Sequence, residues 1–190
     1  VTGSTAAGMR ASMDSISISG GISGDITATA NVDSAYGMHA EYDVIVDDGI
    51  TGNITAQATT GKEAYGIRSE RATTISGGIS GTISATAGTE YALGIYGNTG
   101  LLINGDISGS ITGETIAGDN ASAIRAGGSV TTGNISGVLS ATAGADKAYG
   151  IYGADVAING VVSGRISATA ANDQAYGIYA TSLGIDGDIS

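Results

Sequence analysis

Cysteine, proline, tryptophan and phenylalanine are all absent from this chain of 190 residues. Without cysteine the protein has no disulfide bond and no thiolate metal site. The only aromatic residues are nine tyrosines, so a core must be built mainly from small aliphatic side chains. No stretch is long and apolar enough to cross a membrane as a helix, and we expect membrane attachment only through an anchor outside this segment.

Basic residues are also scarce. Seven lysines and arginines stand against 18 aspartates and glutamates, which gives a formal net charge of −11. A protein that wraps nucleic acid needs a basic face to neutralise the phosphates, and anionic membrane surfaces make a similar demand. We therefore expect no nucleic-acid partner, and we interpret the acidity as a means of keeping an elongated protein soluble.

Glycine is abundant, with 33 residues. Hydrophobic residues make up 42% of the chain, which is enough for a folded core and argues against disorder. Isoleucine, valine, threonine and tyrosine favour strands, whereas so much glycine opposes helices. The composition thus predicts an all-β protein.

A repeat of 27 to 29 residues runs through the whole chain. The segment AYGI, or a variant of it, ends at Met9, Met38, Ile67, Ile95, Ile124, Ile151 and Ile178. A second series with the same spacing is formed by Ile22, Ile50, Ile79, Ile107, Ile135, Val162 and Ile189. Such spacing is typical of solenoids, in which equivalent residues of successive coils stack on one another.

Within each repeat the apolar residues lie two positions apart, or at multiples of two, as in Leu101, Ile103, Ile107 and Ile111. This period is typical of strands, whose successive side chains point to opposite faces. The repeat length varies only before and after the AYGI segment, so these two places are predicted to be turns. Each coil should therefore carry a long bent strand block, a polar turn, a short AYGI strand and a second turn.

We therefore predict an all-β fold, a right-handed parallel β-helix (β-solenoid) of about seven coils with 27–29 residues each. Residues 1–190 are expected to form a single β-solenoid segment cut from a longer repeat array. The repeats carry no polar end caps, and the open ends of a solenoid need caps or further stacking. The array is thus expected to continue or to associate end to end.

Copies such as NISGVLSATAGADKAYGIYGADVAINGVVSGRISATA, from Asn134 to Ala170, resemble the repeats in the passenger domains of bacterial autotransporters. The resemblance covers essentially all 190 residues. It implies a right-handed parallel β-helix that is exported across the outer membrane and acts mostly as an adhesin or surface fibre. Filamentous haemagglutinin-like exoproteins and phage fibres share this architecture.

An acidic residue occurs once per coil in the turn before the AYGI segment. Carboxylates stacked about 5 Å apart repel one another unless cations intervene, and calcium prefers such oxygen ligands. A calcium ladder is one hypothesis, and a solvated turn, partly neutralised by Lys62 and Lys147, is the other. No further cofactor is expected. The candidate metal ligands are Asp33, Glu63, Glu90, Asp119, Asp146 and Asp173.

The position directly after the AYGI segment carries a flat or cationic side chain in every coil. Arginine and tyrosine suit sugar rings and acidic glycans, but they also stabilise neighbouring coils by stacking on each other. The candidate ligand-binding residues are Arg10, His39, Arg68, Tyr96, Arg125, Tyr152 and Tyr179.

A second column, inside the AYGI segment, consists of Tyr36, Tyr65, Tyr149 and Tyr176, and it is interrupted by Leu93 and Ser122. These positions share their parity with the isoleucine that ends the segment. Because residues of one parity point to one face of a strand, we expect the tyrosines to pack in the core or at a corner.

No catalytic group stands out. The only histidine is His39, and no serine has a base partner suggested by the sequence. Asp47 with Asp48, and Asp186 with Asp188, offer the carboxylate pairs that glycoside hydrolysis requires. Adjacent residues on a strand point opposite ways, however, and the short turns leave no cleft. We therefore expect no enzymatic activity.

The expected function is that of an exported bacterial cell-surface rod, which serves outside the cell as a stiff fibre or adhesin stalk with repeated shallow ligand surfaces. The alternative is a polysaccharide-binding or polysaccharide-degrading β-helix protein. The expected partners are further coils of the same kind and a host or matrix glycan or protein.

Overall fold

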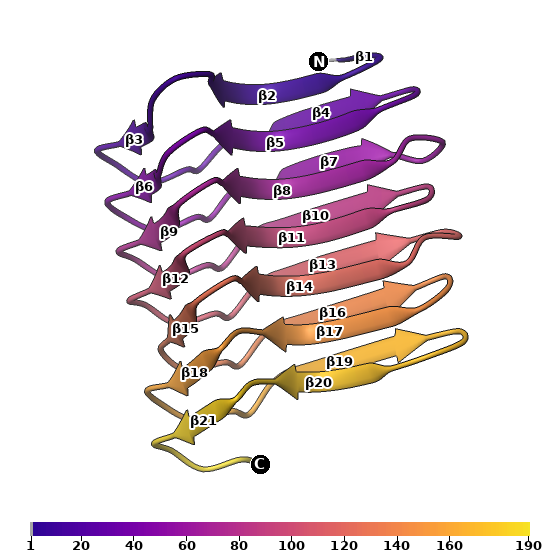
Figure 1. Cartoon of the computed structure of the whole chain (residues 1–190). Coiled ribbons are helices and arrows are strands. Elements are labelled where there is room, and N and C mark those ends of the chain that lie inside the picture. The colour runs from indigo at the N-terminus through magenta and orange to yellow at the C-terminus, as the bar shows by residue number, and fades with distance from the viewer. Residues whose placement is uncertain (1) are drawn as a thin grey trace.

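The computed structural model describes residues 2–190, which form 21 strands joined by turns. Over this range there is no helix, and hence none that could cross a membrane. The strands make three parallel sheets of seven strands each, and every coil adds one strand to each sheet (Figure 1). The strand propensity of the composition is thus expressed along the whole of the described chain.

The three sheets are named A, B and C. Sheet A consists of β1 (Thr2–Gly3), β4 (Ile26–Ala30), β7 (Ile54–Ala58), β10 (Thr82–Ala87), β13 (Ser110–Thr115), β16 (Val138–Ala143) and β19 (Arg165–Ala170). Sheet B consists of β2 (Ala6–Ala11), β5 (Ser34–Ala40), β8 (Glu63–Ser69), β11 (Tyr91–Gly97), β14 (Asn120–Ala126), β17 (Lys147–Tyr152) and β20 (Ala175–Tyr179). Sheet C consists of β3 (Ile16–Ile18), β6 (Val44–Val46), β9 (Ala72–Ile75), β12 (Gly100–Ile103), β15 (Ser129–Thr132), β18 (Asp155–Ile158) and β21 (Ser182–Ile185).

This arrangement confirms the predicted parallel β-solenoid, and the seven strands of each sheet agree with the predicted number of about seven coils. Each strand pairs with its equivalent in the next coil, as β8 does with β11, so the backbone hydrogen bonds run along the stack. The isoleucine series that begins at Ile22 forms a line of isolated parallel bridges up to Ile189. The right-handed sense of the coils stays a prediction.

The long strand block expected from the sequence is divided between two sheets. In the second full coil, for example, β6 belongs to sheet C and β7 belongs to sheet A, with only the bridge at Ile50 between them. Glycines mark both bends: a Cβ at Gly81 would lie 1.9 Å from the carbonyl oxygen of Gly52 in the preceding coil. Only a residue without a side chain allows the backbones of successive coils to approach so closely there.

The core has a thick and a thin part. Isoleucines from all three sheets fill the thick part, and the column that contains Met38, Ile67 and Ile95 is fully buried there, as predicted. Each such side chain contributes roughly 1.5–3 kcal/mol through burial. Where sheets A and B lie back to back, the core holds mainly alanines, such as Ala56 and Ala64, and β13 contributes Gly113 and the buried Thr115 instead. Small residues are required here because the two sheets approach closely.

Candidate functional site

The outer face of sheet B gathers the aromatic and arginine side chains, because sheet B breaks the alternation of a regular strand. In β5, Met38 is fully buried in the core, and a Cβ added at Gly37 would lie 2.4 Å from Cγ2 of Ile54. Gly37 and Met38 therefore both point inward. The residues on either side of this pair, Tyr36 and His39, both point outward, and their rings stack 4.6 Å apart.

The tyrosine column consequently lies on the opposite face from the one that parity suggested. Tyr65 is only 6% exposed, but it belongs to an outer cluster with Tyr36, Leu93 and Tyr96 rather than to the isoleucine core. The prediction that these tyrosines share the side of the following isoleucines is therefore wrong. The cause is Gly37 and its equivalents: the glycine points inward beside the inward isoleucine or methionine, so the tyrosine before it points outward. The burial of the tyrosines is confirmed for Tyr36, Tyr65 and Tyr149, whereas Tyr176 is exposed.

The seven candidate ligand-binding residues form one continuous column on this face. The strand registers pair each of them with its neighbours in the order Arg10, His39, Arg68, Tyr96, Arg125, Tyr152 and Tyr179. The sequence spacing thus predicted their alignment correctly. Their surroundings, however, differ along the stack, and they divide the face into three regions.

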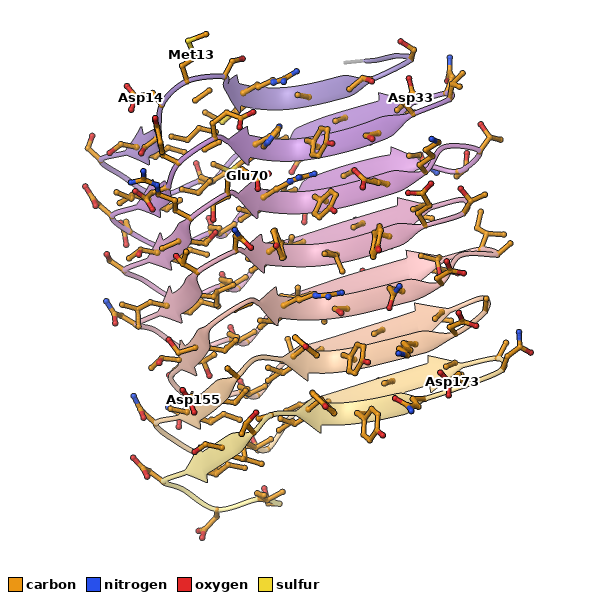
Figure 2. All side chains as sticks on the ribbon, in the orientation of Figure 1. Met13, Asp14, Asp33, Glu70, Asp155 and Asp173 are labelled. Atoms are coloured by element: carbon orange, nitrogen blue, oxygen red, sulfur yellow. The ribbon has the colours of Figure 1, made fainter. Side chains whose placement is uncertain are left out.

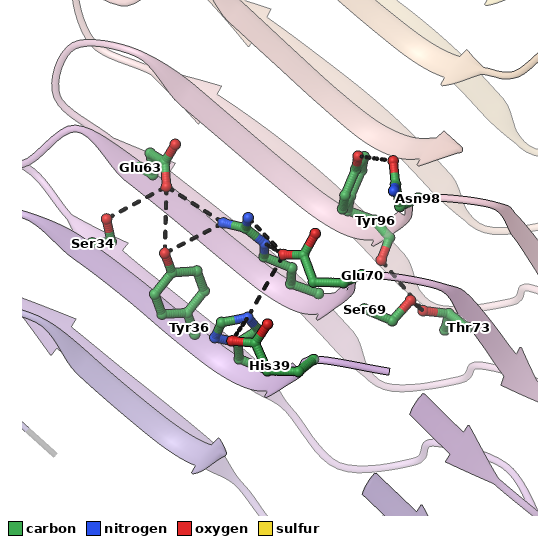
Figure 3. Close-up of polar contacts among 11 residues, drawn as sticks. Ser34, Tyr36, His39, Glu63, Ser69, Glu70, Thr73, Tyr96 and Asn98 are labelled. Atoms are coloured by element: carbon green, nitrogen blue, oxygen red, sulfur yellow. Dashed lines mark hydrogen bonds and ion pairs between the residues drawn. The ribbon is translucent and has the colours of Figure 1, made fainter. Parts of the chain in front are cut away.

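The first region surrounds Arg68, which is held by two carboxylates. Its Nε and Nη2 both lie 2.7 Å from Oε1 of Glu70, and its Nη1 lies 3.5 Å from Oε2 of Glu63 (Figure 3). The guanidinium carbon lies 4.7 Å from the centre of the Tyr65 ring, and Tyr36 donates a hydrogen bond to Glu63. Arg68 is therefore occupied by internal partners, as the stacking interpretation expects.

His39 lies beside this cluster and is 6% exposed. Neither ring nitrogen has a hydrogen-bond partner within residues 2–190, although Nε2 is 3.8 Å from Glu70. Burial, and secondly the charge of Arg68, lowers the pKa of His39 below its ordinary value of 6.5, against the opposing effect of Glu41. The ring therefore favours its neutral form, in which it stacks on Tyr36.

The third region, at the C-terminal end of the column, is a cluster of four tyrosines. Tyr149 stacks on Tyr176, and Tyr152 stacks on Tyr179 at a centroid distance of 5.3 Å. The guanidinium of Arg125 lies 4.9 Å from the centre of the Tyr152 ring. Burial raises the pKa of Tyr149 above its ordinary value, so its phenol stays protonated.

Between these two regions the face is hollowed, because Leu93 and Ser122 replace the tyrosine of the inner column. The hollow has a volume of about 210 Å³ and is lined by Tyr65, Tyr91, Leu93, Tyr96 and Arg125. The predicted ligand-binding residues did not include Tyr91. They also did not include Glu63 and Glu70, which pair with Arg68. The break in the tyrosine column at Leu93 and Ser122 was the sequence signal that could have located the hollow.

The predicted acidic ladder is misaligned at one position. Glu63 lies beside Ser34 and Tyr91 in the register of sheet B, and not beside Asp33 and Glu90. Lys62 instead lies beside Asp33, because the backbone N–H of Lys62 donates a hydrogen bond to the carbonyl of Asp33. Glu63 stands only four residues before Ile67, whereas Asp33 stands five residues before Met38, so the acidic side chain of β8 lies one position nearer to the AYGI segment.

Apart from Glu63, which begins β8, the acidic residues stand at the outer turns between sheets A and B, where Figure 2 labels Asp33 and Asp173. Nowhere in residues 2–190 do three acidic or histidine side chains gather closely enough to hold a metal ion. The Nζ of Lys62 lies 4.0 Å from Glu90 and offsets part of the charge. The geometry therefore favours the solvated turn over the calcium ladder.

The two carboxylate pairs considered for glycoside hydrolysis are exposed. Asp47 and Asp48 lie just after β6, and Oδ1 of Asp48 accepts a hydrogen bond from the backbone N–H of Gly49. Asp186 and Asp188 follow β21 in the last coil.

No protein-family model, curated protein or solved structure was found to match this chain. The functional argument therefore rests on the geometry of the solenoid and of the outer face of sheet B.

Proposed function

We propose that this chain is a segment of a stiff structural and adhesive rod on the outside of a bacterial cell. The regular stacking of three parallel sheets supports a mechanical role, because a backbone hydrogen-bond ladder along the axis resists both stretching and bending. The acidic composition and the resemblance of the repeats to autotransporter passengers support a location outside the cell. The outer face of sheet B supplies the ligand surface of the rod.

The observation that carries the proposal is the stacking itself: each coil is covered by its neighbours through three parallel sheets, and the core is exposed only where a coil lacks a neighbour. Ile189 is 71% exposed and Leu183 is 51% exposed, whereas their equivalents Ile107 and Leu101 in the middle of the stack are buried. An open hollow of about 290 Å³ lies among Val162, Gly164, Ile166, Gly177, Ile178, Ile185 and Ile189. Such an end exposes both apolar side chains and unpaired strand edges.

The surface that fits this end is a further coil with the same side-chain columns. It would bury the exposed isoleucines and continue all three hydrogen-bond ladders. When the 190-residue segment is prepared by itself, a second copy offers such a coil, so the isolated segment should associate end to end.

Sedimentation velocity and electron microscopy test this association. We expect rods whose length grows with protein concentration. The double variant Leu183→Lys, Ile189→Lys should remain monomeric, because two charges on the open end oppose stacking. The matched control is Ile116→Lys, Val138→Lys, which adds the same charge at exposed apolar positions on the sides of the rod and should still associate. A wild-type chain that stays monomeric at all concentrations, or equal behaviour of the two variants, would contradict the proposal.

A further inference from the structure

The hollow on the outer face of sheet B differs from the rest of that face in being unfilled. On its N-terminal side Tyr36 and Tyr65 stack 5.6 Å apart, and on its C-terminal side Tyr149 and Tyr176 stack 5.9 Å apart. Between them the same column carries Leu93 and Ser122, whose side chains are too short to continue the stack. The interruption leaves space for a flat group of about the size of the missing rings.

The walls of the hollow are aromatic, and one of them has a fixed orientation. The rings of Tyr65 and Tyr96 are tilted by 60° to each other at a centroid distance of 6.0 Å. The hydroxyl of Tyr96 donates to Oδ1 of Asn98 at 2.9 Å, which holds this ring in place (Figure 3). Tyrosine rings offer an apolar face to the C–H groups of a sugar ring and a hydroxyl to its polar rim.

Arg125 gives the hollow its charge. Unlike Arg68, it has no carboxylate within ion-pair distance among residues 2–190, and its only contact of this kind is with the ring of Tyr152. Arg10, Arg71 and Arg165 likewise form no ion pair within residues 2–190, but among these arginines only Arg125 lines the hollow. Its planar donors suit a carboxylate, which they bind through two parallel hydrogen bonds.

A buried hydroxyl next to the hollow also lacks a partner. Ser122 is fully buried, lies beside Leu93 in the register of sheet B, and its Oγ forms no hydrogen bond within residues 2–190. Buried polar groups are normally hydrogen-bonded, but Ser122 is not among the residues that line the hollow, so a ligand there would not reach its hydroxyl.

We propose that the hollow binds a single pyranose ring that carries a carboxylate, that is, a uronic acid residue of an acidic polysaccharide. The volume of about 210 Å³ suits one ring, because it is smaller than the roughly 300–1,000 Å³ of typical small-molecule sites. In this arrangement the ring lies against Tyr65, Tyr91 and Tyr96, and its carboxylate meets Arg125. The net negative charge of the chain would repel an approaching anion, but salt at 0.15 M screens this repulsion beyond about 8 Å.

Binding of a uronic acid names a ligand for the adhesive part of the proposed function and rests on that part. The association of open ends is a separate property, so either can fail while the other holds. The neighbouring carboxylate Glu63 does not compete for Arg125, because it accepts hydrogen bonds from Ser34 and Tyr36 and pairs with Arg68. The hollow thus presents one cation and three phenol rings to a ligand.

Titration of the full chain with trigalacturonate, followed by NMR in calcium-free buffer with 0.15 M salt, tests the proposal. We expect shifts confined to the residues around the hollow. Fully methyl-esterified trigalacturonate, which keeps the rings and loses the charge, should bind at least about tenfold more weakly. Equal binding of the two probes, no binding of either, or identical shifts with acetate alone would overturn the proposal.

Three variants locate the binding. Arg125→Gln should weaken the binding of trigalacturonate about tenfold or more, because the carboxylate loses its charged partner. The matched control Arg71→Gln removes an arginine that stacks on Tyr42 away from the hollow, and it should leave binding unchanged. Leu93→Tyr introduces the residue that equivalent coils carry, so it should fill the hollow and abolish binding while the chain stays folded. Undiminished binding by Leu93→Tyr would also overturn the proposal.

Discussion

His39 is a residue that faces outward and is nevertheless buried. It stacks on Tyr36, and the charges of Arg68 and Arg10 act on it from the coils on either side. Burial and these positive charges lower its pKa below 6.5, while Glu41 and Glu70 oppose the shift. The residues of the column from Arg10 to Tyr179 thus stabilise the stack of coils where they contact side chains of neighbouring coils, as Arg68 contacts Tyr36.

The lowered pKa of His39 predicts a pH dependence of stability. Below pH 6.5 the unfolded chain binds a proton at this residue that the folded chain resists, so the free energy of unfolding should fall as the pH falls from 6.5 towards the folded-state pKa. Thermal unfolding between pH 7.5 and about 5, above the range where most carboxylates titrate, measures this. The variant His39→Gln should lose this part of the pH dependence. The same pH profile in both proteins would contradict the prediction.

At the scale of the element, the strand of sheet B owes its shape to one glycine. Gly66 points inward next to Ile67, and a Cβ there would lie 2.5 Å from Cγ2 of Ile83 and from the carbonyl oxygen of Gly94. The chain contains one natural exception. Ala123 takes the place of the glycine in β14, and in that coil the isoleucine column carries Leu139, which has no methyl branch at Cβ.

This pairing predicts that Gly66→Ala destabilises the protein by about 1–3 kcal/mol, as overpacking does. Adding Ile83→Leu should recover part of the loss, because it removes the methyl group that the new Cβ meets. Thermal or urea unfolding of the two single variants and the double variant measures the coupling. The control is Ala123→Gly, which changes the same position in the coil that already tolerates alanine. Simple additivity of Gly66→Ala and Ile83→Leu would contradict this explanation.

At the scale of the whole molecule, each coil contacts only its neighbours, so local stability depends on position in the stack. The middle coils have a partner on both sides. The last coil has one on a single side, and its residues Ile178 and Ile185 are only partly buried. In the isolated segment the last coil is therefore expected to open more easily than the middle coils.

Hydrogen exchange should reveal this gradient. In the monomeric double variant Leu183→Lys, Ile189→Lys, backbone amides of β10 and β11 should exchange more slowly than those of β20 and β21, because only the end coils open without breaking two interfaces. Exchange detected by NMR or mass spectrometry measures the difference. Equal protection along the stack would show that the solenoid opens as one unit.

The sequence alone determined the repeat length, the all-β class and the alignment of the interior columns. Stacking in a solenoid places the same residue type at the same position of every coil, so the Met38, Ile67 and Ile95 column is visible as a spacing. For the same reason the column from Arg10 to Tyr179 could be aligned correctly before its surroundings were known.

Only the tertiary structure decided which face the tyrosines occupy and how the outer face is hollowed. Each depends on a contact between segments that are distant in the sequence. Gly37 points inward towards Ile54 of the facing sheet, which leaves no room for a Cβ there. The period of a strand does not contain that contact. The hollow likewise exists only because sheet B brings the short side chains of Leu93 and Ser122 between stacked rings of other coils.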